Sequence, residues 1–310
     1  MNIKNILLVS PMYRDLQALI ENVAPHKTFR FMPEEGLAQE DISWADALVS
    51  FNLKTDYDYS TVKWVHSLGA GVDRFLHKKD WNQEILLTRT ICSFGQRIAE
   101  YCLSYILKDL QLHDRFQEQQ QQKHWVQSTP KLIGEQKVLV YGTGEIGQMI
   151  AKVFSGLGVD VYGVSISGKE KAGFKKVMTV DSHFSVLDEV NYVINTLPLT
   201  ERTERLFDGV IFNQLSNAGF MNVGRGASVD EAALLQALNV NKVKFAVLDV
   251  FELEPLPKSN PLWNHPRVQI TPHISAVTTP SEGAACFLET LKNIDENRAL
   301  TNRVDTHKGY

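Results

Sequence analysis

The stretch KVLVYGTGEIG, residues 137–147, decides the fold because an apolar run leads directly into glycines spaced as GxGxxG. Gly142 allows a tight turn, Gly144 lets a backbone approach a pyrophosphate, and Gly147 lets a helix pack closely on a strand. Apolar residues at helical spacing follow, so strand, turn and helix together predict a dinucleotide-binding site. An ordinary glycine turn is the alternative. We assign cofactor contacts to Gly142, Gly144, Glu145, Ile146 and Gly147.

The tip of the next predicted strand, residues 159–164, bears on which dinucleotide binds. An acidic side chain there would accept hydrogen bonds from the ribose 2′-OH of NAD, but Ser165 occupies this position. Ser167 and Lys169 follow closely. Because a hydroxyl and a cation suit a 2′-phosphate, we expect NADP(H) to be the preferred cofactor and NAD(H) the second choice. A solvated loop that happens to carry lysine is the alternative interpretation.

Apolar runs of strand length recur along the chain, with helix-compatible segments between them. The runs are continuous rather than alternating, as in parallel strands that are covered on both faces. A first series comprises residues 6–10, 28–32, 45–50, 62–68 and 85–88. A second series comprises residues 137–142, 159–165, 191–197, 218–223, 244–250 and 268–272. Two such series predict an α/β protein with two parallel-sheet domains.

Two helices are predicted outside these alternating units. Apolar residues at helical spacing over residues 95–123 predict one helix that crosses from one domain to the other. Its Gln-rich end, residues 117–122, is either an oligomer arm or a solvated helix face. Near the C-terminus, Thr279 and Glu282 form a capping box around Pro280, which predicts a helix that begins at residue 280.

The composition restricts the class of partner. With 310 residues, 44% hydrophobic and 22% charged, the chain is typical of soluble globular proteins. Its net charge of −4 is spread without a basic block, which argues against nucleic acid or a membrane and favours a small molecule. Three separated cysteines suggest neither disulfides nor a zinc site, so we expect no metal and a cytoplasmic location. The apolar run 6–9 is too short for a signal peptide.

Three ionisable side chains follow successive strands of the second series: Arg225 in NVGRG, Glu254 in DVFELEPLP and His273 in TPHIS. Ligands of doubly wound sheets lie beyond the carboxyl ends of strands, so we expect these groups to converge. Histidine can supply a proton as hydride reduces a carbonyl, and a carboxylate can orient the imidazole. The planar fork of arginine matches a substrate carboxylate. Taken singly, each is also compatible with a surface or packing role.

The chain resembles the D-isomer-specific 2-hydroxyacid dehydrogenase family over most of its length. The order and spacing of several blocks carry the resemblance: SLGAGVDRF (67–75), RIAEYCL (97–103), GTGEIG (142–147), NTLPLTERT (195–203), GFMNVGRGASVDEAALLQAL (219–238), LDVFELEP (248–255) and TPHIS (271–275). Within the family, the LGAGVD loop and the serine-containing segment are most similar to glyoxylate and hydroxypyruvate reductases. One departure concerns the cofactor, because NADP-linked members often carry arginine where this chain has Ile166.

The resemblance implies roles for individual residues. Arg225 would be the catalytic arginine, His273 the acid/base, and Glu254 its carboxylate partner. The backbone N–H groups of Gly69, Ala70 and Gly71 would hold the substrate carboxylate. The other implied cofactor contacts are Leu197, Pro198 and Thr203 on the adenosine side and Asp249 near the nicotinamide carboxamide.

The family fold implies two doubly wound parallel-sheet domains with a cleft between them. A flavodoxin-like substrate domain would comprise residues 1–94 and 279–310, and a Rossmann cofactor domain residues 95–278. The last helix would pack on the first domain, and hinge closure would exclude water. The family also implies a homodimer.

These observations together predict an NAD(P)H-dependent reductase of small 2-oxo acids, with glyoxylate and hydroxypyruvate as leading substrates. D-3-phosphoglycerate dehydrogenase is an alternative within the family, although its substrate needs extra cations for the phosphate. A nucleotide-sensing protein similar to transcriptional corepressors is the alternative from another class. A methyltransferase is a weaker alternative, because it leaves the three ionisable residues unexplained.

Overall fold

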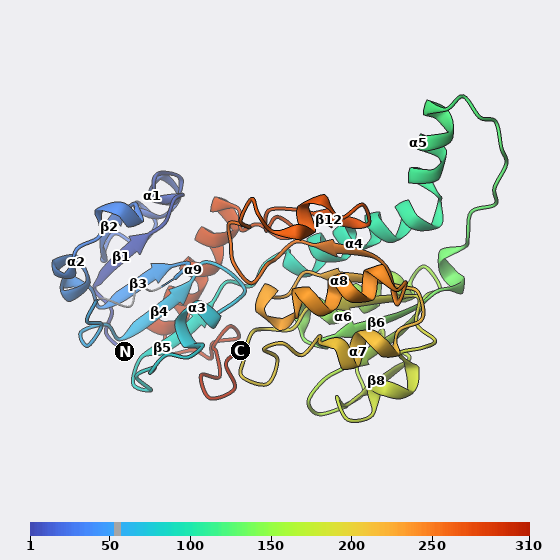
Figure 1. Cartoon of the computed structure of the whole chain (residues 1–310). Coiled ribbons are helices and arrows are strands. Elements are labelled where there is room, and N and C mark those ends of the chain that lie inside the picture. The colour runs from blue at the N-terminus through green and yellow to red at the C-terminus, as the bar shows by residue number, and fades with distance from the viewer. Residues whose placement is uncertain (53–56) are drawn as a thin grey trace. The chain divides into compact units, whose positions relative to one another are not determined.

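The structure, a computed structural model, describes residues 1–52 and 57–310 and divides into two compact units (Figure 1). Unit 1 comprises Met1–Phe94 and Val277–Tyr310, and unit 2 comprises Gly95–Ala276. The chain therefore returns from unit 2 to unit 1 between residues 276 and 277, whereas the sequence predicted this boundary between residues 278 and 279. The chain begins in unit 1, builds unit 2 and returns to unit 1.

Unit 1 is built on a five-stranded parallel sheet in the order β2-β1-β3-β4-β5. Its strands are β1 (Asn5–Val9), β2 (Thr28–Met32), β3 (Ala47–Ser50), β4 (Trp64–Ser67) and β5 (Leu86–Arg89). This order is that of flavodoxin-like doubly wound sheets. The predicted fold class is confirmed for this unit.

Helices cover both faces of the sheet in unit 1. They are α1 (Tyr13–Ile20), α2 (Gln39–Trp44), α3 (Asp73–Leu76) and α9 (Pro280–Asp295), with a 3₁₀ turn η1 (Glu34–Gly36). The predicted start of α9 is confirmed, because the Thr279 hydroxyl accepts from Glu282 N and the Glu282 carboxylate accepts from Thr279 N. α9 packs on this unit through Phe287, whose ring stacks on Trp64 at 5.6 Å between centroids.

Unit 2 is built on a seven-stranded parallel sheet in the order β12-β11-β10-β9-β6-β7-β8. Its strands are β6 (Lys137–Tyr141), β7 (Asp160–Val164), β8 (Lys176–Met178), β9 (Tyr192–Asn195), β10 (Ala218–Asn222), β11 (Val243–Leu248) and β12 (Val268–Ile270). Counted from β6, the first six strands follow the Rossmann order, and β12 extends the sheet. The short edge strand β8 was not predicted, since its three residues form no apolar run of strand length.

Two pairs of helices sandwich the sheet of unit 2. α4 (Phe94–Leu110) and α6 (Glu145–Ser155) pack on one face, and α7 (Gly209–Gln214) and α8 (Glu231–Asn239) pack on the other. Short 3₁₀ turns complete the unit: η2 (Ile133–Glu135), η3 (His183–Val186), η4 (Gly226–Ser228) and η5 (Pro261–Asn264). Strands covered on both faces explain the continuous apolar runs.

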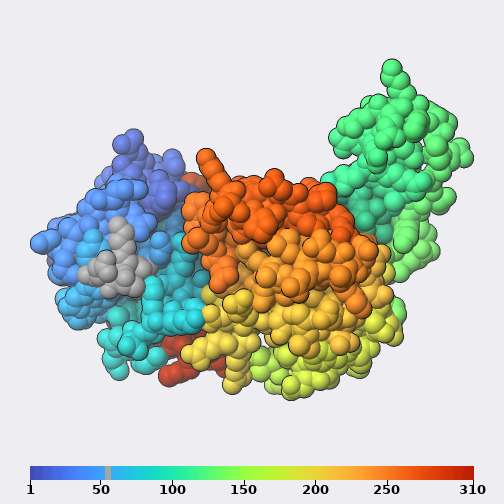
Figure 2. Space-filling view, in the orientation of Figure 1, coloured from blue at the N-terminus to red at the C-terminus, as the bar shows by residue number. Residues whose placement is uncertain are grey.

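The prediction of one helix over residues 95–123 is wrong. α4 ends at Leu110, Leu112 adopts a left-handed φ of 58°, and a separate helix α5 (His113–Gln121) follows. The apolar spacing that holds α4 against the sheet stops at Leu110, so α5 has no buried residue. α5 and the following loop project from the rest of unit 2 (Figures 1 and 2).

The described residues contain neither a candidate membrane span nor a candidate group of metal ligands. No helix among them is both long and apolar enough to cross a membrane. No group of three or more His, Cys, Asp or Glu side chains among them is arranged to hold a metal ion. Cys102 and Cys286 are free thiols.

Two buried tyrosines on the paired strands β6 and β9 differ in their hydrogen bonding. The Tyr192 hydroxyl donates to Asp109 Oδ2 at 2.6 Å, and Lys244 Nζ reaches the same oxygen at 2.5 Å. The Tyr141 hydroxyl is equally buried, but it has no hydrogen-bond partner within the described part of the chain. Burial raises the pKa of both phenols, so both remain neutral near physiological pH.

We expect these tyrosines to respond differently to removal of the hydroxyl. Tyr192→Phe should lower the free energy of unfolding by about 1.5–3 kcal/mol, because it removes a hydrogen bond to a carboxylate. Tyr141→Phe should leave the free energy of unfolding unchanged or raise it by about 1 kcal/mol, because it removes an unsatisfied buried group. Urea denaturation of both variants tests this contrast. Equal losses in the two variants would contradict it.

Candidate active site

The glycine turn between β6 and α6 leaves no space for side chains at two of its three positions. Gly142 has φ +98°, and a Cβ placed on it would lie 2.5 Å from Thr196 Oγ1. A Cβ on Gly147 would lie 1.8 Å from the Gly142 carbonyl oxygen. In contrast, a Cβ on Gly144 would meet no described atom within 4 Å. The turn therefore packs against its own backbone and Thr196 at Gly142 and Gly147, and it leaves space at Gly144, where α6 begins. A pyrophosphate site requires this arrangement.

The loop after β7 carries the residues expected near a 2′-phosphate. The Ser165 hydroxyl accepts a hydrogen bond from Gly168 N at 3.2 Å, and the Ser167 hydroxyl accepts one from Lys169 N at 3.4 Å. Ser167 and Lys169 are exposed, and so is Ile166, while Ser165 is half-buried. The two serines thus shape a tight loop that presents the lysine at the surface.

The segment 197–203, expected on the adenosine side, is a loop with internal hydrogen bonds, and its residues are half-buried except for the exposed Glu201 and Arg202. Leu197 N donates to Asn195 Oδ1 at 3.0 Å, which fixes the start of the loop. The Thr203 hydroxyl donates to the Pro198 carbonyl at 2.6 Å and accepts from Thr200 N at 2.8 Å. Because its hydroxyl forms hydrogen bonds inside the loop, Thr203 stabilises the conformation of the loop.

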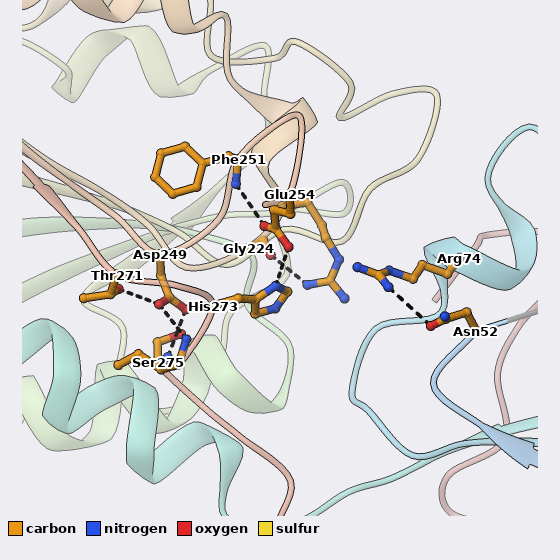
Figure 3. Close-up of polar contacts among 11 residues, drawn as sticks. Asn52, Arg74, Gly224, Asp249, Phe251, Glu254, Thr271, His273 and Ser275 are labelled. Atoms are coloured by element: carbon orange, nitrogen blue, oxygen red, sulfur yellow. Dashed lines mark hydrogen bonds and ion pairs between the residues drawn. The ribbon is translucent and has the colours of Figure 1, made fainter. Parts of the chain in front are cut away.

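His273 and Glu254 are brought together by loops that follow β12 and β11. Nδ1 of His273 lies 2.9 Å from Glu254 Oε2, and Glu254 Oε1 accepts from Phe251 N at 3.0 Å (Figure 3). The His273 side chain is 44% exposed, and that of Glu254 is 25% exposed. His273 also has φ +56°, a left-handed conformation that is unfavourable for a residue with a Cβ. The imidazole therefore sits in a constrained turn, held by one nitrogen and accessible to solvent.

Asp249 supports this turn from inside the protein. It is fully buried, and its carboxylate accepts from Thr271 Oγ1 at 2.5 Å, Ile274 N at 2.8 Å and Ser275 N at 2.9 Å (Figure 3). Its backbone carbonyl accepts from His273 N at 2.8 Å. These four hydrogen bonds compensate for the unfavourable φ of His273. A contact between Asp249 and a nicotinamide carboxamide stays a prediction.

Arg225 lies in the loop between β10 and η4. Its Nη1 donates to the Gly224 carbonyl at 2.8 Å, so the guanidinium folds toward its own loop. The next residue, Gly226, presses on the chain that leads to Glu254, because a Cβ there would lie 1.8 Å from the Phe251 carbonyl carbon. Because β10, β11 and β12 are parallel neighbours, the loops of Arg225, Glu254 and His273 all leave the same edge of the sheet.

The loop of Gly69, Ala70 and Gly71 follows β4 in unit 1. Three donors hold its carbonyl oxygens: Ser67 Oγ donates to those of Gly69 and Gly71, Thr90 N donates to that of Gly69 at 3.3 Å, and Arg89 Nη1 donates to that of Ala70 at 3.2 Å. Within the described part of the chain, the N–H groups of Ala70 and Gly71 have no acceptor. A backbone whose carbonyls are occupied and whose N–H groups are available suits an anion.

His66 lies beneath this loop in the core of unit 1. It is fully buried, with Nδ1 2.8 Å from Thr88 Oγ1 and Nε2 3.3 Å from Thr90 Oγ1. The Thr90 hydroxyl donates in turn to the Ser67 carbonyl at 3.0 Å, at the start of the loop. Burial lowers the pKa of His66 to about 3, so it is neutral at physiological pH.

This buried imidazole should make stability depend on pH. In the unfolded chain a histidine titrates near its ordinary pKa of about 6.5. Between that value and about 3 the unfolded state binds a proton that the folded state does not, so stability falls as the pH falls. Urea denaturation at several pH values should show a slope steeper in the wild type than in His66→Gln, by up to about 1.4 kcal/mol per pH unit. Equal slopes would contradict this, and His307→Gln, at an exposed histidine, serves as the control.

Known proteins match this chain over both units. Residues 103–275 match the family model described as D-isomer specific 2-hydroxyacid dehydrogenase, NAD binding domain. A glyoxylate/hydroxypyruvate reductase A from Enterobacter sp. (strain 638) is 34% identical over 256 residues, covering 80% of this chain and 82% of that protein. The chain belongs to the D-isomer specific 2-hydroxyacid dehydrogenase family.

Solved structures of other D-isomer specific 2-hydroxyacid dehydrogenases agree with this. The protein from Xanthobacter autotrophicus Py2 in complex with NADPH and MES has a TM-score of 0.90 and 27% identity, with 100% of both chains covered. The protein from Aeromonas salmonicida has a TM-score of 0.84 and 30% identity, covering 98% of this chain and 100% of that one. The family resemblance noted in the sequence is confirmed.

The site of this dehydrogenase also contains residues to which sequence reasoning gave no role. Thr196 donates through Oγ1 to the Tyr141 carbonyl at 2.8 Å and so supports the glycine turn. The Tyr101 hydroxyl, from α4, lies 2.7 Å from the hydroxyl of Thr271, two residues before His273. Asn195 and Asn222 end β9 and β10 as buried polar residues. A polar residue at the last position of an apolar strand was the signal that could have identified the asparagines.

Proposed function

We propose that this dehydrogenase catalyses NAD(P)H-dependent reduction of small 2-oxo acids, with glyoxylate and hydroxypyruvate as leading substrates, to 2-hydroxy acids. The observation that carries the proposal is the His273–Glu254 pair, with 2.9 Å between Nδ1 and Oε2, on the sheet edge that also carries the glycine turn. Glyoxylate/hydroxypyruvate reductases at 34% identity support the choice of substrates.

His273 would be the proton donor through Nε2. Glu254 holds Nδ1, so Nε2 is the nitrogen that can face a reacting oxygen. Phe251 N fixes the other carboxylate oxygen of Glu254, which prevents the carboxylate from rotating away from the imidazole. The bound reduced nicotinamide would supply the hydride. A proton from His273 would neutralise the negative charge that develops on the substrate oxygen.

Arg225 and the loop of unit 1 would bind the substrate. Ala70 N and Gly71 N offer two hydrogen-bond donors to a carboxylate, and Gly69 shapes the same loop. The guanidinium of Arg225 can bind a carboxylate and polarise the carbonyl beside it. In this proposal residues 1–94 and 279–310 act as the substrate domain and residues 95–278 as the cofactor domain, with closure to exclude water.

The proposed cofactor is NADP(H), with NAD(H) as the second choice. Ser165, Ser167 and Lys169 provide hydroxyls and a cation where a 2′-phosphate would lie, and a structural relative at 27% identity was solved with NADPH. Leu197, Pro198 and Thr203 would line the adenosine side. The open space at Gly144 supports a pyrophosphate beside Glu145 and Ile146.

We expect kcat/KM to be higher with NADPH than with NADH. Lys169→Ala should lower kcat/KM for NADPH by about 3- to 10-fold and leave that for NADH nearly unchanged, because an exposed cation contributes modestly to phosphate binding. Lys152→Ala, an exposed lysine on α6, is the matched control and should affect neither cofactor. Higher efficiency with NADH in the wild type would overturn the preference.

A substrate panel with both reduced cofactors tests the reaction itself. We expect turnover of glyoxylate and hydroxypyruvate to exceed oxidation of 3-phosphoglycerate, measured with the oxidised cofactors. Dominant activity on 3-phosphoglycerate would favour the alternative within the family. Cofactor binding without turnover of any 2-oxo acid would favour a nucleotide-sensing protein.

A homodimer and a cytoplasmic location also belong to the proposal. The projecting segment supports dimer formation, because α5 has no buried residue and Trp125 in the following loop is 96% exposed. A partner subunit that covers this segment would shield the apolar side chain of Trp125 from water. Sedimentation velocity tests the assembly, and a monomer at assay concentrations would contradict it.

A further inference from the structure

Three buried polar side chains form one hydrogen-bonded network at the ends of β9 and β10. Asn195 Nδ2 donates to Asn222 Oδ1 at 2.9 Å and to Ser228 Oγ at 2.7 Å. The three side chains are at most 1% exposed. A polar network in a buried location is stabilising only when its members are satisfied, so its outward connections matter.

One side of the network holds the backbone of Arg225. The Arg225 carbonyl accepts from Asn222 Nδ2 at 3.1 Å and from Ser228 Oγ at 2.5 Å. Asn222 Oδ1 also accepts from Gly224 N at 3.2 Å. Ser228 N also donates to this carbonyl, at 3.2 Å. Three donors on a single carbonyl fix the peptide plane that follows Arg225, and with it the direction in which the side chain leaves the loop.

The other side of the network holds the loop 197–203. Asn195 Oδ1 accepts from Leu197 N at 3.0 Å. The two loops are also in close backbone contact, because a Cβ on Gly224 would lie 2.7 Å from the Leu197 carbonyl oxygen. Asn195 is therefore the one side chain of the three that bonds both to the loop 197–203 and to the group that supports Arg225.

The amide orientation of Asn195 follows from these partners. If Oδ1 and Nδ2 were exchanged, oxygen would face Asn222 Oδ1, and nitrogen would face the Leu197 N–H group. Both contacts would then be repulsive. Asn195 therefore uses both amide hydrogens and its oxygen within the network, so any substitution leaves a buried group unpaired.

We propose that Asn195, Asn222 and Ser228 are positioning residues that couple the loop 197–203 to the orientation of Arg225. The inference rests on the proposed function for the meaning of both ends, since it takes the loop as a cofactor contact and Arg225 as a substrate contact. Displacement of the loop by a bound dinucleotide would be transmitted through Asn195 to the peptide that carries Arg225. The network thus links cofactor binding to the geometry of the substrate site.

Ser228→Ala and Asn195→Ala separate the two ends. Ser228→Ala removes the shortest of the three bonds to the Arg225 carbonyl and leaves the Leu197 bond intact. We therefore expect kcat/KM for the 2-oxo acid to fall on the order of 10- to 100-fold, while the Kd for NADPH changes less than about twofold. Asn195→Ala should damage both quantities. If Asn195→Ala does not fold, Asn195→Ser replaces it. Thr290→Val is the control, because it removes an equally buried hydroxyl from α9 in unit 1.

A double-mutant cycle with Arg225→Ala distinguishes positioning from general loss of stability. If Ser228 acts through Arg225, then Ser228→Ala should change kcat/KM less than about twofold once the arginine side chain is absent. Losses that multiply in the double variant would overturn the proposal. So would an unchanged kcat/KM in Ser228→Ala.

Failure of the proposed function would give a different result. A wild-type protein without turnover of 2-oxo acids would remove that function but leave the network to be tested by structure. A crystal structure of Ser228→Ala should then show the peptide of Arg225 rotated relative to the wild-type crystal structure. An unchanged peptide and side chain would overturn the positioning role itself.

Discussion

Replacement of His273 by glutamine is expected to lower kcat by about 10²- to 10⁴-fold, the usual contribution of a general acid. Glutamine can still donate a hydrogen bond from the same region, but it cannot release a proton to the substrate oxygen. The turn should survive, because Asp249 holds it through backbone N–H groups and the Thr271 hydroxyl rather than through the imidazole. The Kd for NADPH should therefore remain within about threefold of the wild-type value.

Steady-state kinetics with glyoxylate, together with fluorescence titration of NADPH, provide the two readouts. His307→Gln is the matched control, since this exposed histidine lies outside the segments assigned to the site and to the proposed dimer contact. Near-normal kcat in His273→Gln would remove His273 from the mechanism. A large loss of NADPH binding instead would indicate that the turn had been damaged.

The second large effect is expected for Arg225→Ala. A charge-assisted contact to a carboxylate is worth about 1.5–3 kcal/mol, so kcat/KM for 2-oxo acids should fall by at least about 10- to 100-fold. Arg225→Lys should recover only part of this loss, because an ammonium group lacks the planar fork that pairs with a carboxylate. The charge is retained in this variant, so the difference between the two variants measures the geometry of the guanidinium.

The control for Arg225 is an arginine with a known surface partner in the same unit. Arg205 forms an exposed ion pair with Asp230 at 3.1 Å, and Arg205→Ala should leave kcat/KM nearly unchanged. Comparison of glyoxylate with a 2-oxo compound that lacks the carboxylate gives a further test. The wild type should strongly favour the acid, and Arg225→Ala should lose most of that preference. Equal kinetics for Arg225→Ala and wild type would contradict the assigned contact.

The sequence predicted what local rules determine. The glycine turn could be identified because Gly142 and Gly147 are required by backbone contacts within one strand, turn and helix. The capping box of α9 was visible for the same reason, since Thr279 and Glu282 lie three positions apart and bond to each other. The two sheets followed from continuous apolar runs, which reflect burial on both faces.

Features that depend on distant partners could not be predicted. The left-handed φ of His273 depends on Asp249, which lies on another strand end and was assigned from the family resemblance to a cofactor contact. The bond of Asn195 to Ser228 spans 33 positions and leaves no spacing pattern. The separation of α4 and α5 arises at Leu112, an apolar residue that carries no turn signal of its own.

A crystal structure of the protein with NADP⁺ and glycolate, the expected product from glyoxylate, tests the central claim most directly. We expect the glycolate hydroxyl within hydrogen-bonding distance of His273 Nε2, and its carboxylate bound by Arg225 and by the N–H groups of Ala70 and Gly71. The nicotinamide ring should lie against the glycolate carbon that carries this hydroxyl. A nicotinamide that binds away from His273, or glycolate that contacts neither His273 nor Arg225, would contradict the proposed mechanism.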